Sequence, residues 1–274
     1  MIGSVHLSPD ALDRLVRQLR AAGCVFAEDE AVLLAEAAGS ANELEALVVR
    51  RQGGEPLEQL VGWVEFCGLR LAVAPGVFVP RQRTALLVDE VARLVRPGSV
   101  LVDLGCGVGA IAAAVLARVP GVEAYAVDVD PAAVACARRN LPAERVFEGD
   151  LYAGLPATLR GTVDVVAANA PYVPSTAIAL MPREARDHEH LVALDGGPDG
   201  LAVQRRVVAE ASAWLRPGGH VLVETSRGQL AGTSAALEKA GMTVTERYDD
   251  ASGGLVARGT TYPKRGMQPA RSTT

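Results

Sequence analysis

One segment of this 274-residue chain constrains its fold more than any other, the glycine-rich run Asp103-Leu104-Gly105-Cys106-Gly107-Val108-Gly109. It stands between a short aliphatic stretch at 99–103 and an alanine-rich stretch at 110–118. Glycines at a strand-to-helix turn let the backbone approach a ligand closely, and the helix N-terminus offers unpaired N–H groups. The run therefore predicts a first strand, a ligand-binding turn and a first helix of an α/β sheet.

The chain after this turn alternates between predicted strands and helices. Strands are expected at 122–127, 145–148, 163–168 and 220–224, helices at 130–140 and 201–215, and a closing hairpin near 243–248 and 254–257. Aromatic residues make up only 4% of the chain, so the core must be built from aliphatic side chains, as in buried parallel strands. The pattern predicts a mostly parallel, doubly wound sheet with helices on both faces.

The N-terminal part has a helical pattern instead. Ser8-Pro9 predicts a helix start, and two more helices are expected at 28–38 and 42–51. A hairpin-like linker follows at about 60–80, and then a helix at 84–94. We therefore expect an N-terminal helical bundle at 1–59, a β-hairpin linker at 60–82, an α/β domain at 83–260 and a disordered tail at 261–274.

Composition and charge limit the classes of protein to consider. The formal net charge is −5, which argues against an affinity that rests on nucleic-acid phosphates. No apolar run approaches the roughly 20 residues of a membrane span, and the first ten residues lack the apolar region of a signal peptide. The four cysteines and four histidines show no metal-ligand spacing. We expect free thiols, no metal and a cytoplasmic location.

The glycine-rich turn by itself fits two cofactors. Gly105, Gly107 and Ala110 satisfy the dinucleotide pattern, and Asp128 suits the ribose hydroxyls of either cofactor. Three features favour S-adenosylmethionine: an acid before the glycines to take its ammonium group, an acidic turn after the third strand where adenine would lie, and a polar motif after the fourth strand. The predicted cofactor-binding residues are Asp103, Gly105, Cys106, Gly107, Val108, Gly109, Asp128, Asp150, Leu151 and Asn169. The alternative for Cys106 is a structural role as a small residue that fills space in the loop. The alternative for Asp150 is a role as the cap of a turn.

The polar motif is Asn169-Ala170-Pro171-Tyr172, directly after the predicted strand 163–168. An amide nitrogen is a poor nucleophile because its lone pair is delocalised into the carbonyl. The Asn169 side-chain oxygen and the Ala170 carbonyl can each accept one N–H of a primary amide, and these bonds strengthen as the nitrogen becomes cationic. Pro171 restricts Ala170 to extended conformations, and the Tyr172 ring can cover the amide. We predict methyl transfer to an amide-like nitrogen, with these four residues catalytic.

The motif and its surroundings resemble the protein-(glutamine-N5) methyltransferases, which modify release factors or a ribosomal protein and carry Asn-Pro-Pro-Tyr at this place. Segments 60–66 and 75–81 resemble the family's linker, and Glu189 with 193–201 resembles its segment after the motif. The resemblance implies a Rossmann-like S-adenosylmethionine-dependent methyltransferase fold with a small N-terminal helical bundle joined by a hairpin linker. It also implies that the acceptor is the N5 of a glutamine in a protein docked on the bundle, with no direct nucleic-acid or membrane partner.

Three departures from the family pattern concern the acceptor. Ala170 replaces a proline but keeps the functional carbonyl, and His190 replaces a proline in a loop expected near the substrate. Where the family reads Arg-Pro-x-Thr-Glu, this chain has Arg81-Gln82-Arg83-Thr84-Ala85. An acid is lost and a guanidinium is gained. If both positions line the pocket, we expect a charge change of up to two units that suits a peptide with acidic flanks.

Three other interpretations stay open at this point. The same site can methylate a small amino-acid-like molecule through its amide, amine or guanidine. A nucleic-acid amino-methyltransferase is disfavoured by the net charge and by a bundle without a basic stripe. A non-catalytic binding module is disfavoured because Asp103, the three glycines, Asp128 and Asn169 are all intact.

Overall fold

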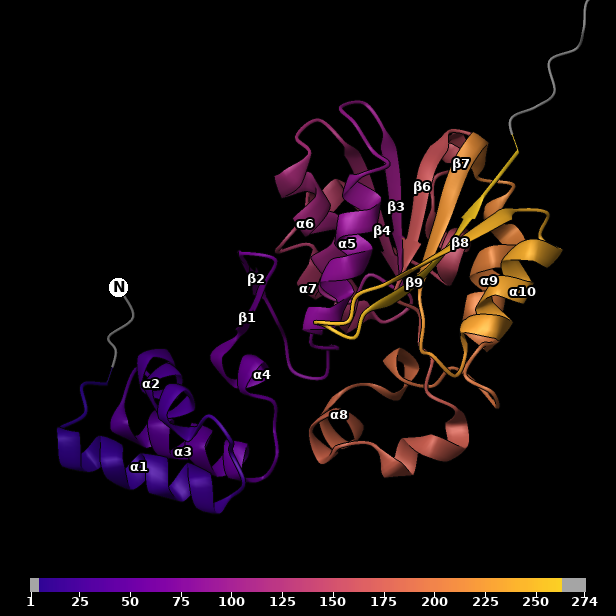
Figure 1. The fold of residues 1–274 in the computed structure, drawn as a ribbon. Helices are drawn as coiled ribbons and strands as arrows, with labels where there is room; N and C mark the ends of the chain where they lie inside the picture. Colours follow the sequence, from indigo (N-terminus) through magenta and orange to yellow (C-terminus); the bar gives the residue numbers. More distant parts are fainter. Residues whose placement is uncertain (1–4, 263–274) are drawn as a thin grey trace, which may run out of the picture.

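The computed structural model describes residues 5–262, which form three parts in chain order. Figure 1 shows a helical bundle apart from the sheet, a small hairpin beside it, and a large sheet with helices on both sides. Within the described residues, no helix is long and apolar enough to cross a bilayer. Except for Thr261 and Tyr262, the tail predicted at 261–274 lies outside the described residues.

The bundle has a hydrophobic core of its own, built around Leu19, Leu34 and Leu47. Its helices are α1 (Pro9–Ala21), α2 (Ala27–Ala37), α3 (Ala41–Gln52) and α4 (Leu57–Val61). Ser8 caps α1 by accepting from the Ala11 N–H at 3.3 Å, as expected from Ser-Pro. The short helix α4 was not predicted, because it spans only five residues between Pro56 and Gly62.

The linker contains a shorter hairpin than expected, β1 (Trp63–Phe66) with β2 (Leu69–Ala72). Cys67 and Gly68 form its turn, and both have positive φ, 51° and 77°. Two central residues of positive φ are typical of tight hairpin turns. The chain then runs without a strand to the 3-10 helix η1 (Gln82–Thr84) and the helix α5 (Ala85–Ala92).

The large sheet confirms the predicted topology. Its strands are β3 (Val100–Leu104), β4 (Glu123–Asp128), β5 (Val146–Glu148), β6 (Val163–Ala168), β7 (Leu215–Glu224), β8 (Thr243–Tyr248) and β9 (Leu255–Thr260). The order is β5-β4-β3-β6-β7-β9-β8, and β9 runs antiparallel to both of its neighbours, while β5, β4, β3, β6 and β7 pair in parallel. The chain leaves β3 toward β4 and later returns to β6 on the other side of β3, so the strand order reverses there. Ligands bind at such a switch point, beyond the carboxyl ends of the strands.

Besides α5, the helices that cover the sheet are α6 (Ala110–Arg118), α7 (Pro131–Ala137), α9 (Ala202–Ala211) and α10 (Leu230–Lys239). α6 has the predicted bounds, α10 was not predicted, and α9 is shorter than the predicted 201–215. The run 216–219, expected as a break, lies inside β7, where the pairing with β6 shifts register between Val163 and Val165. Such a bulge tolerates Pro217, which has no N–H for the ladder.

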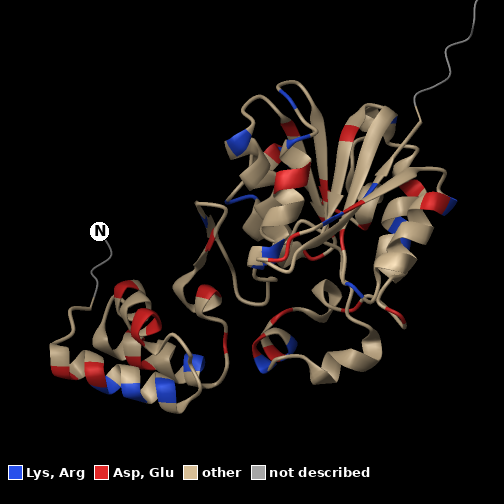
Figure 2. Cartoon of the chain, viewed as in Figure 1, with Lys and Arg blue, Asp and Glu red and all other residues tan. Residues whose placement is uncertain are grey.

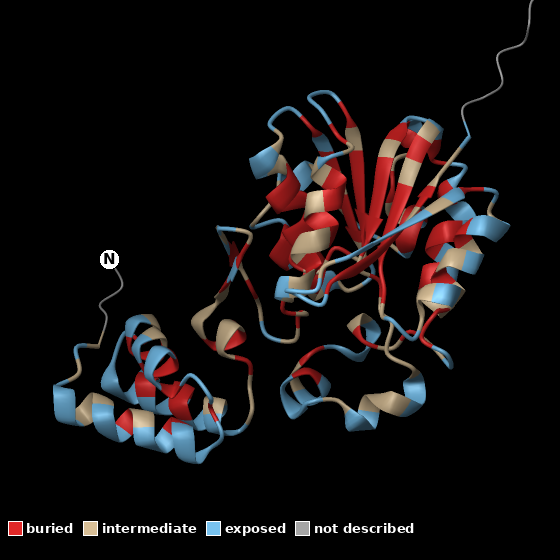
Figure 3. Cartoon of the chain, viewed as in Figure 1, coloured by how far each residue is buried: buried red, intermediate tan, exposed pale blue. Residues whose placement is uncertain are grey.

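The central strands of the sheet are mostly buried (Figure 3), and their side chains alternate between two cores, one on each face of the sheet. Leu101, Val165 and Leu222 pack on the face covered by α5 and α6. Val102 and Val166 point to the opposite face, which α9 and α10 cover. With both faces covered, the open carboxyl edge is left for the site.

An insert between β6 and α9 lies under this edge, beside the linker (Figure 1). It contains the 3-10 helices η5 (Ser175–Leu180) and η6 (Leu191–Ala193) and the helix α8 (Arg183–His188). The remaining 3-10 helices are η2 (Ala143–Arg145), η3 (Leu151–Gly154) and η4 (Ala157–Leu159). An ion pair between Arg51 of α3 and Glu184 of α8, at 2.6 Å, ties the bundle to this insert.

Candidate active site

One pocket brings together most of the residues predicted for cofactor binding and catalysis. It lies at the carboxyl ends of β3, β4 and β6, where the strand order reverses. Its lining includes Gly105, Cys106, Gly107, Val108, Asp128, Asp150, Leu151, Asn169, Ala170, Pro171 and Tyr172. The glycine-rich turn and the motif after β6 thus face one cavity, whereas Asp103 and Gly109 are not among its lining residues.

The glycine-rich turn needs its glycines for two different reasons. Gly105, Gly107 and Gly109 have φ of 67°, 56° and 80°, in the left-handed region that side chains disfavour. A Cβ on Gly105 or Gly107 would meet no protein atom within 4 Å, so these two face open space. A Cβ on Gly109 would lie 2.6 Å from Leu141 Cδ1, so this glycine allows close packing instead.

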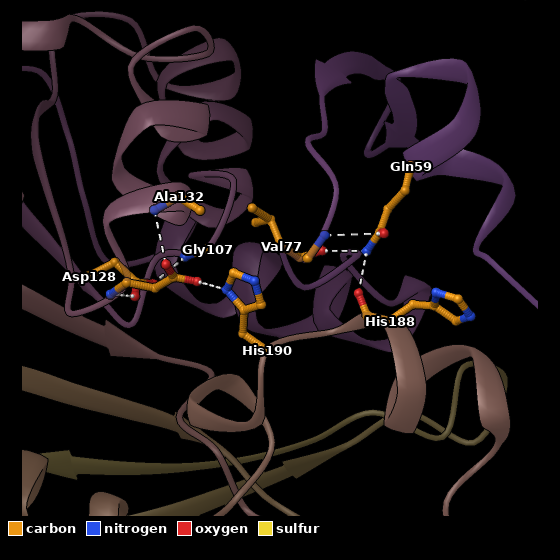
Figure 4. Close-up of polar contacts among 9 residues, drawn as sticks. Gln59, Val77, Gly107, Asp128, Ala132, His188 and His190 are labelled. Carbon is orange, nitrogen blue, oxygen red and sulfur yellow. Dashed lines mark hydrogen bonds and ion pairs between the residues drawn. The ribbon is translucent and has the colours of Figure 1, made fainter.

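Asp128 at the end of β4 braces this turn (Figure 4). Its Oδ2 accepts from the Gly107 N–H at 2.8 Å, and its Oδ1 accepts from the Asp130 N–H at 2.9 Å. Burial raises the pKa of its carboxyl group, while these backbone hydrogen bonds oppose the rise. Each oxygen keeps a further lone pair, so the carboxylate can still accept from the hydroxyls of a ribose.

Asp103 is a predicted cofactor residue that does not line the pocket. Its side chain is 0% exposed, and Oδ2 accepts from the Ala112 N–H of α6 at 3.1 Å. Burial raises its pKa to about 7. Its Oδ1 is buried with no hydrogen-bond partner among the described residues, while its chain neighbours Leu104 and Gly105 line the pocket. An ionic contact with a cofactor's ammonium group stays a prediction.

The acidic turn after β5 opens toward solvent. Asp150 pairs with Arg206 at 2.7 Å, both side chains being half exposed, and it makes no side-chain cap to η3. Leu151 follows with φ 52°, unusual for a residue with a side chain. Cys106 is buried, and burial raises its thiol pKa well above the usual value, which supports the filler role.

The motif after β6 is held by hydrogen bonds from residues outside it. Asn169 Nδ2 donates to Thr84 Oγ1 at 3.2 Å, and the Tyr172 carbonyl accepts from Gln229 Nε2 at 2.7 Å. The Tyr172 hydroxyl accepts from the Arg83 guanidinium. Ala170 is 2% exposed, which leaves little room for a larger side chain at this position.

The structure corrects the expected charge beside the pocket. Arg83 lines it, but Ala85 is not among the lining residues. Arg83 Nε lies 3.2 Å from Oε1 of Glu224, a residue at the end of β7 that the sequence analysis missed. The buried carboxylate offsets the guanidinium, so the two-unit gain in positive charge does not arise. The signal for Glu224 was the one used for Asp103 and Asp128, an acid at the carboxyl end of a predicted strand.

Two buried polar side chains join the linker to the insert. Glu189 Oε1 accepts from Arg81 Nη2 at 2.6 Å and from the Val79 N–H at 3.2 Å. Gln59 of α4 donates to the carbonyls of Val77 and His188, both at 3.1 Å, and its Oε1 accepts from the N–H of Gly76 at 3.2 Å (Figure 4). The wall of the pocket is therefore connected to the helical bundle.

Comparisons with known proteins agree with this geometry. Residues 68–184 match the family described as "Methyltransferase small domain". A release factor glutamine methyltransferase of Mycolicibacterium smegmatis is 42% identical over 75% of this chain and 74% of its own length. The chain belongs to the release factor glutamine methyltransferase family.

Other members of the release factor glutamine methyltransferase family match to a similar extent. The protein of Geobacter sulfurreducens is 38% identical over 67% of this chain and 65% of its own length. A methyltransferase from Pyrococcus furiosus, at 18% identity, superposes over 80% of this chain and 98% of that chain with a TM-score of 0.54. These matches confirm the predicted fold, and the chain is a methyltransferase enzyme.

Proposed function

We propose that this methyltransferase transfers a methyl group from S-adenosylmethionine to the side-chain amide nitrogen of a glutamine in a protein. The observation that carries the proposal is the shared pocket, in which the glycine-rich turn and Asn169-Ala170-Pro171-Tyr172 line the same cavity. Relatives named release factor glutamine methyltransferase support the choice of a glutamine amide.

The pocket residues fit S-adenosylmethionine. Open space over Gly105 and Gly107 gives room for a ligand against the backbone, and Asp128 retains lone pairs for two ribose hydroxyls. The free Oδ1 of Asp103 suits a cationic ammonium group. When bound, this group supplies a methyl already activated on a sulfonium sulfur. We propose that the ten residues named above for the cofactor hold it, with Gly109 acting through packing.

The motif can hold and activate a primary amide. Asn169 Oδ1 and the Ala170 carbonyl accept no hydrogen bond from residues 5–262, so both are available to the two N–H groups of the acceptor. These bonds strengthen as the nitrogen gains positive charge, which is the differential stabilisation that catalysis requires. Pro171 fixes the direction of the carbonyl, and the Tyr172 ring covers the planar amide. The methylated nitrogen then loses its proton readily without a tuned base.

A protein acceptor fits the connection between bundle and pocket. We propose three parts, the bundle at 1–59, the linker at 60–82 and the catalytic domain at 83–260, with the bundle as docking surface. Figure 2 shows acidic and basic residues intermixed along the helices of the bundle, which suits a protein partner better than a phosphate backbone. A release factor or ribosomal protein, in the cytoplasm, is the proposed partner.

The test is to incubate the protein with labelled S-adenosylmethionine and host lysate and to separate protein, nucleic-acid and small-molecule fractions. We expect label in protein, and peptide mass spectrometry should find a glutamine that gains the mass of one methylene. If the label appears only among small molecules, the acceptor is an amino-acid-like molecule and not a protein. Label in nucleic acid would overturn both the protein and the small-molecule acceptor.

A further inference from the structure

A buried carboxylate lies behind the motif, at the end of β7. Glu224 is 2% exposed, and its Oε2 has no hydrogen-bond partner among residues 5–262. Burial raises the pKa of this carboxyl group, while the Thr84 hydroxyl and the Arg83 guanidinium lower it. A buried, incompletely bonded carboxylate is costly for stability, so its presence beside the pocket calls for another explanation.

Two neighbouring residues of η1, Arg83 and Thr84, lie between Glu224 and the motif. Arg83 Nε lies 3.2 Å from Glu224 Oε1, and Arg83 Nη2 donates to the hydroxyl of Tyr172. The next residue of η1, Thr84, accepts from Asn169 Nδ2 at 3.2 Å through its hydroxyl oxygen, and the same hydroxyl group lowers the pKa of Glu224. Because Thr84 Oγ1 accepts from Asn169, its own proton is free to be donated to the carboxylate.

We propose that Glu224 is a positioning residue for methyl transfer, orienting Asn169 through Thr84 and Tyr172 through Arg83. The proposal rests on the proposed function of the motif. With Nδ2 held by Thr84, the Asn169 side chain presents its oxygen to the acceptor amide. Without this anchor, the Asn169 amide can turn over and present its NH₂ group, which cannot accept a hydrogen bond from the acceptor. Glu224 itself touches no reacting atom.

A readout independent of activity comes from the three asparagines of the chain, Asn42, Asn140 and Asn169. Isotope-labelled asparagine gives one pair of side-chain amide resonances for each. Asn140 Nδ2 bonds the carbonyls of Ala72 and Val108 at 3.0 and 2.8 Å, so it is a matched, bonded reference. Glu224→Gln should shift the Asn169 pair and speed its hydrogen exchange while leaving the Asn140 pair unchanged. Asn169 resonances at their wild-type positions would overturn the proposal.

Glu90→Gln is the matched control for loss of a buried charge. Glu90 is 3% exposed on α5, pairs with Arg93 and is not among the residues that line the pocket. The Glu90→Gln substitution should destabilise the fold without moving the Asn169 resonances. Thr84→Val tests the same chain of contacts without touching the carboxylate, so the proposal stays testable if Glu224→Gln fails to fold.

Kinetics separates positioning from a structural role. Glu224→Gln should lower kcat by about 10- to 100-fold, the cost of a misaligned group, with KM and cofactor affinity changed by less than about threefold. Thr84→Ser should retain most activity, Thr84→Val should lose it, and the double variant should be no worse than Glu224→Gln alone. An additive double variant, or a wild-type kcat in Glu224→Gln, would contradict the proposal. A wild-type enzyme that methylates no glutamine would instead contradict the proposed function, because the resonance experiment needs no acceptor.

Discussion

His190 Nδ1 lies 2.6 Å from Asp130 Oδ2, although the two residues are 60 positions apart in the chain (Figure 4). Asp130 also caps α7, its Oδ1 accepting from the Ala132 N–H at 2.9 Å. The backbone N–H of His190 donates to the Gly76 carbonyl at 2.8 Å. One residue of the insert thus contacts both the linker, through its backbone, and the segment that follows Asp128, through its side chain.

Gly76→Ala should destabilise the fold by two separable effects. A Cβ on Gly76 would lie 2.3 Å from His190 Nε2, and its φ of 82° disfavours any side chain. Adding His190→Ala should remove the steric part and leave a backbone cost of about 1–2 kcal/mol. Urea unfolding of both single variants and the double variant measures the steric cost and the backbone cost separately. A double variant no more stable than Gly76→Ala would show that the ring is not the obstacle. His190→Ala alone should cost less than about 1 kcal/mol, because the His190 side chain is half exposed.

The cofactor site should bind S-adenosylmethionine and not NAD. Asp128→Ala should weaken S-adenosylmethionine at least about tenfold, roughly 1.4 kcal/mol, because it removes the ribose acceptor and the anchor of Gly107 together. Calorimetric titration measures both affinities. Asp150→Ala is the control with a smaller expected loss, since this carboxylate is exposed and paired with Arg206. Binding of NAD without any response to S-adenosylmethionine would refute the cofactor assignment.

Asn169→Ala should nearly abolish turnover while leaving cofactor affinity within about tenfold, or roughly 1.4 kcal/mol. The physical reason is that Asn169 is proposed to aim the acceptor amide, whereas Asp128 and the glycines are proposed to hold the cofactor. Initial rates with saturating cofactor, paired with calorimetry, separate the two effects. A variant that keeps most of its turnover would mean that another group orients the nitrogen.

Stability should fall as the pH rises through the range set by Asp103. Burial raises its pKa from 3.8 to about 7, so between these pH values the folded protein holds a proton that the unfolded chain lacks. The free energy of unfolding therefore falls with rising pH in this window and levels off above it. Asp103→Asn should flatten this part of the profile, as followed by urea unfolding at several pH values. An unchanged slope would show that Asp103 does not titrate there.

The site could be predicted from sequence where its chemistry is local. The glycine-rich turn, Asp128 and the motif each follow a predicted strand, and parallel strands bring their carboxyl ends to one edge. The residues that hold them could not be predicted this way. Asn169 and Thr84 are 85 positions apart in the sequence, and Arg83 and Glu224 are 141 apart. Hydrophobic periodicity cannot predict contacts over such sequence separations.

The fold differed from expectation where local preference and tertiary contacts compete. The helix α8 has six residues, of which only Ala185 is buried. Its sequence therefore lacks the apolar periodicity by which a helix is predicted. The run 216–219 carries proline and glycines, yet pairing of β7 with β6 and β9 draws it into the sheet. Local propensity is a weak guide at such places, because partners far along the chain decide the outcome.

The three hydrogen bonds of Gln59 bear on the distance between the helical bundle and the pocket. One side chain joins α4, the linker and the insert, and its hydrogen bonds help to hold the bundle at one distance from the pocket. On the proposal that the bundle is the docking surface, we expect an acceptor protein to carry its glutamine on a loop of matching length, at roughly 3.3–3.6 Å for each extended residue. Loops of different sequence but equal span would be modified alike, and a loop shortened by two residues would leave its glutamine outside the pocket.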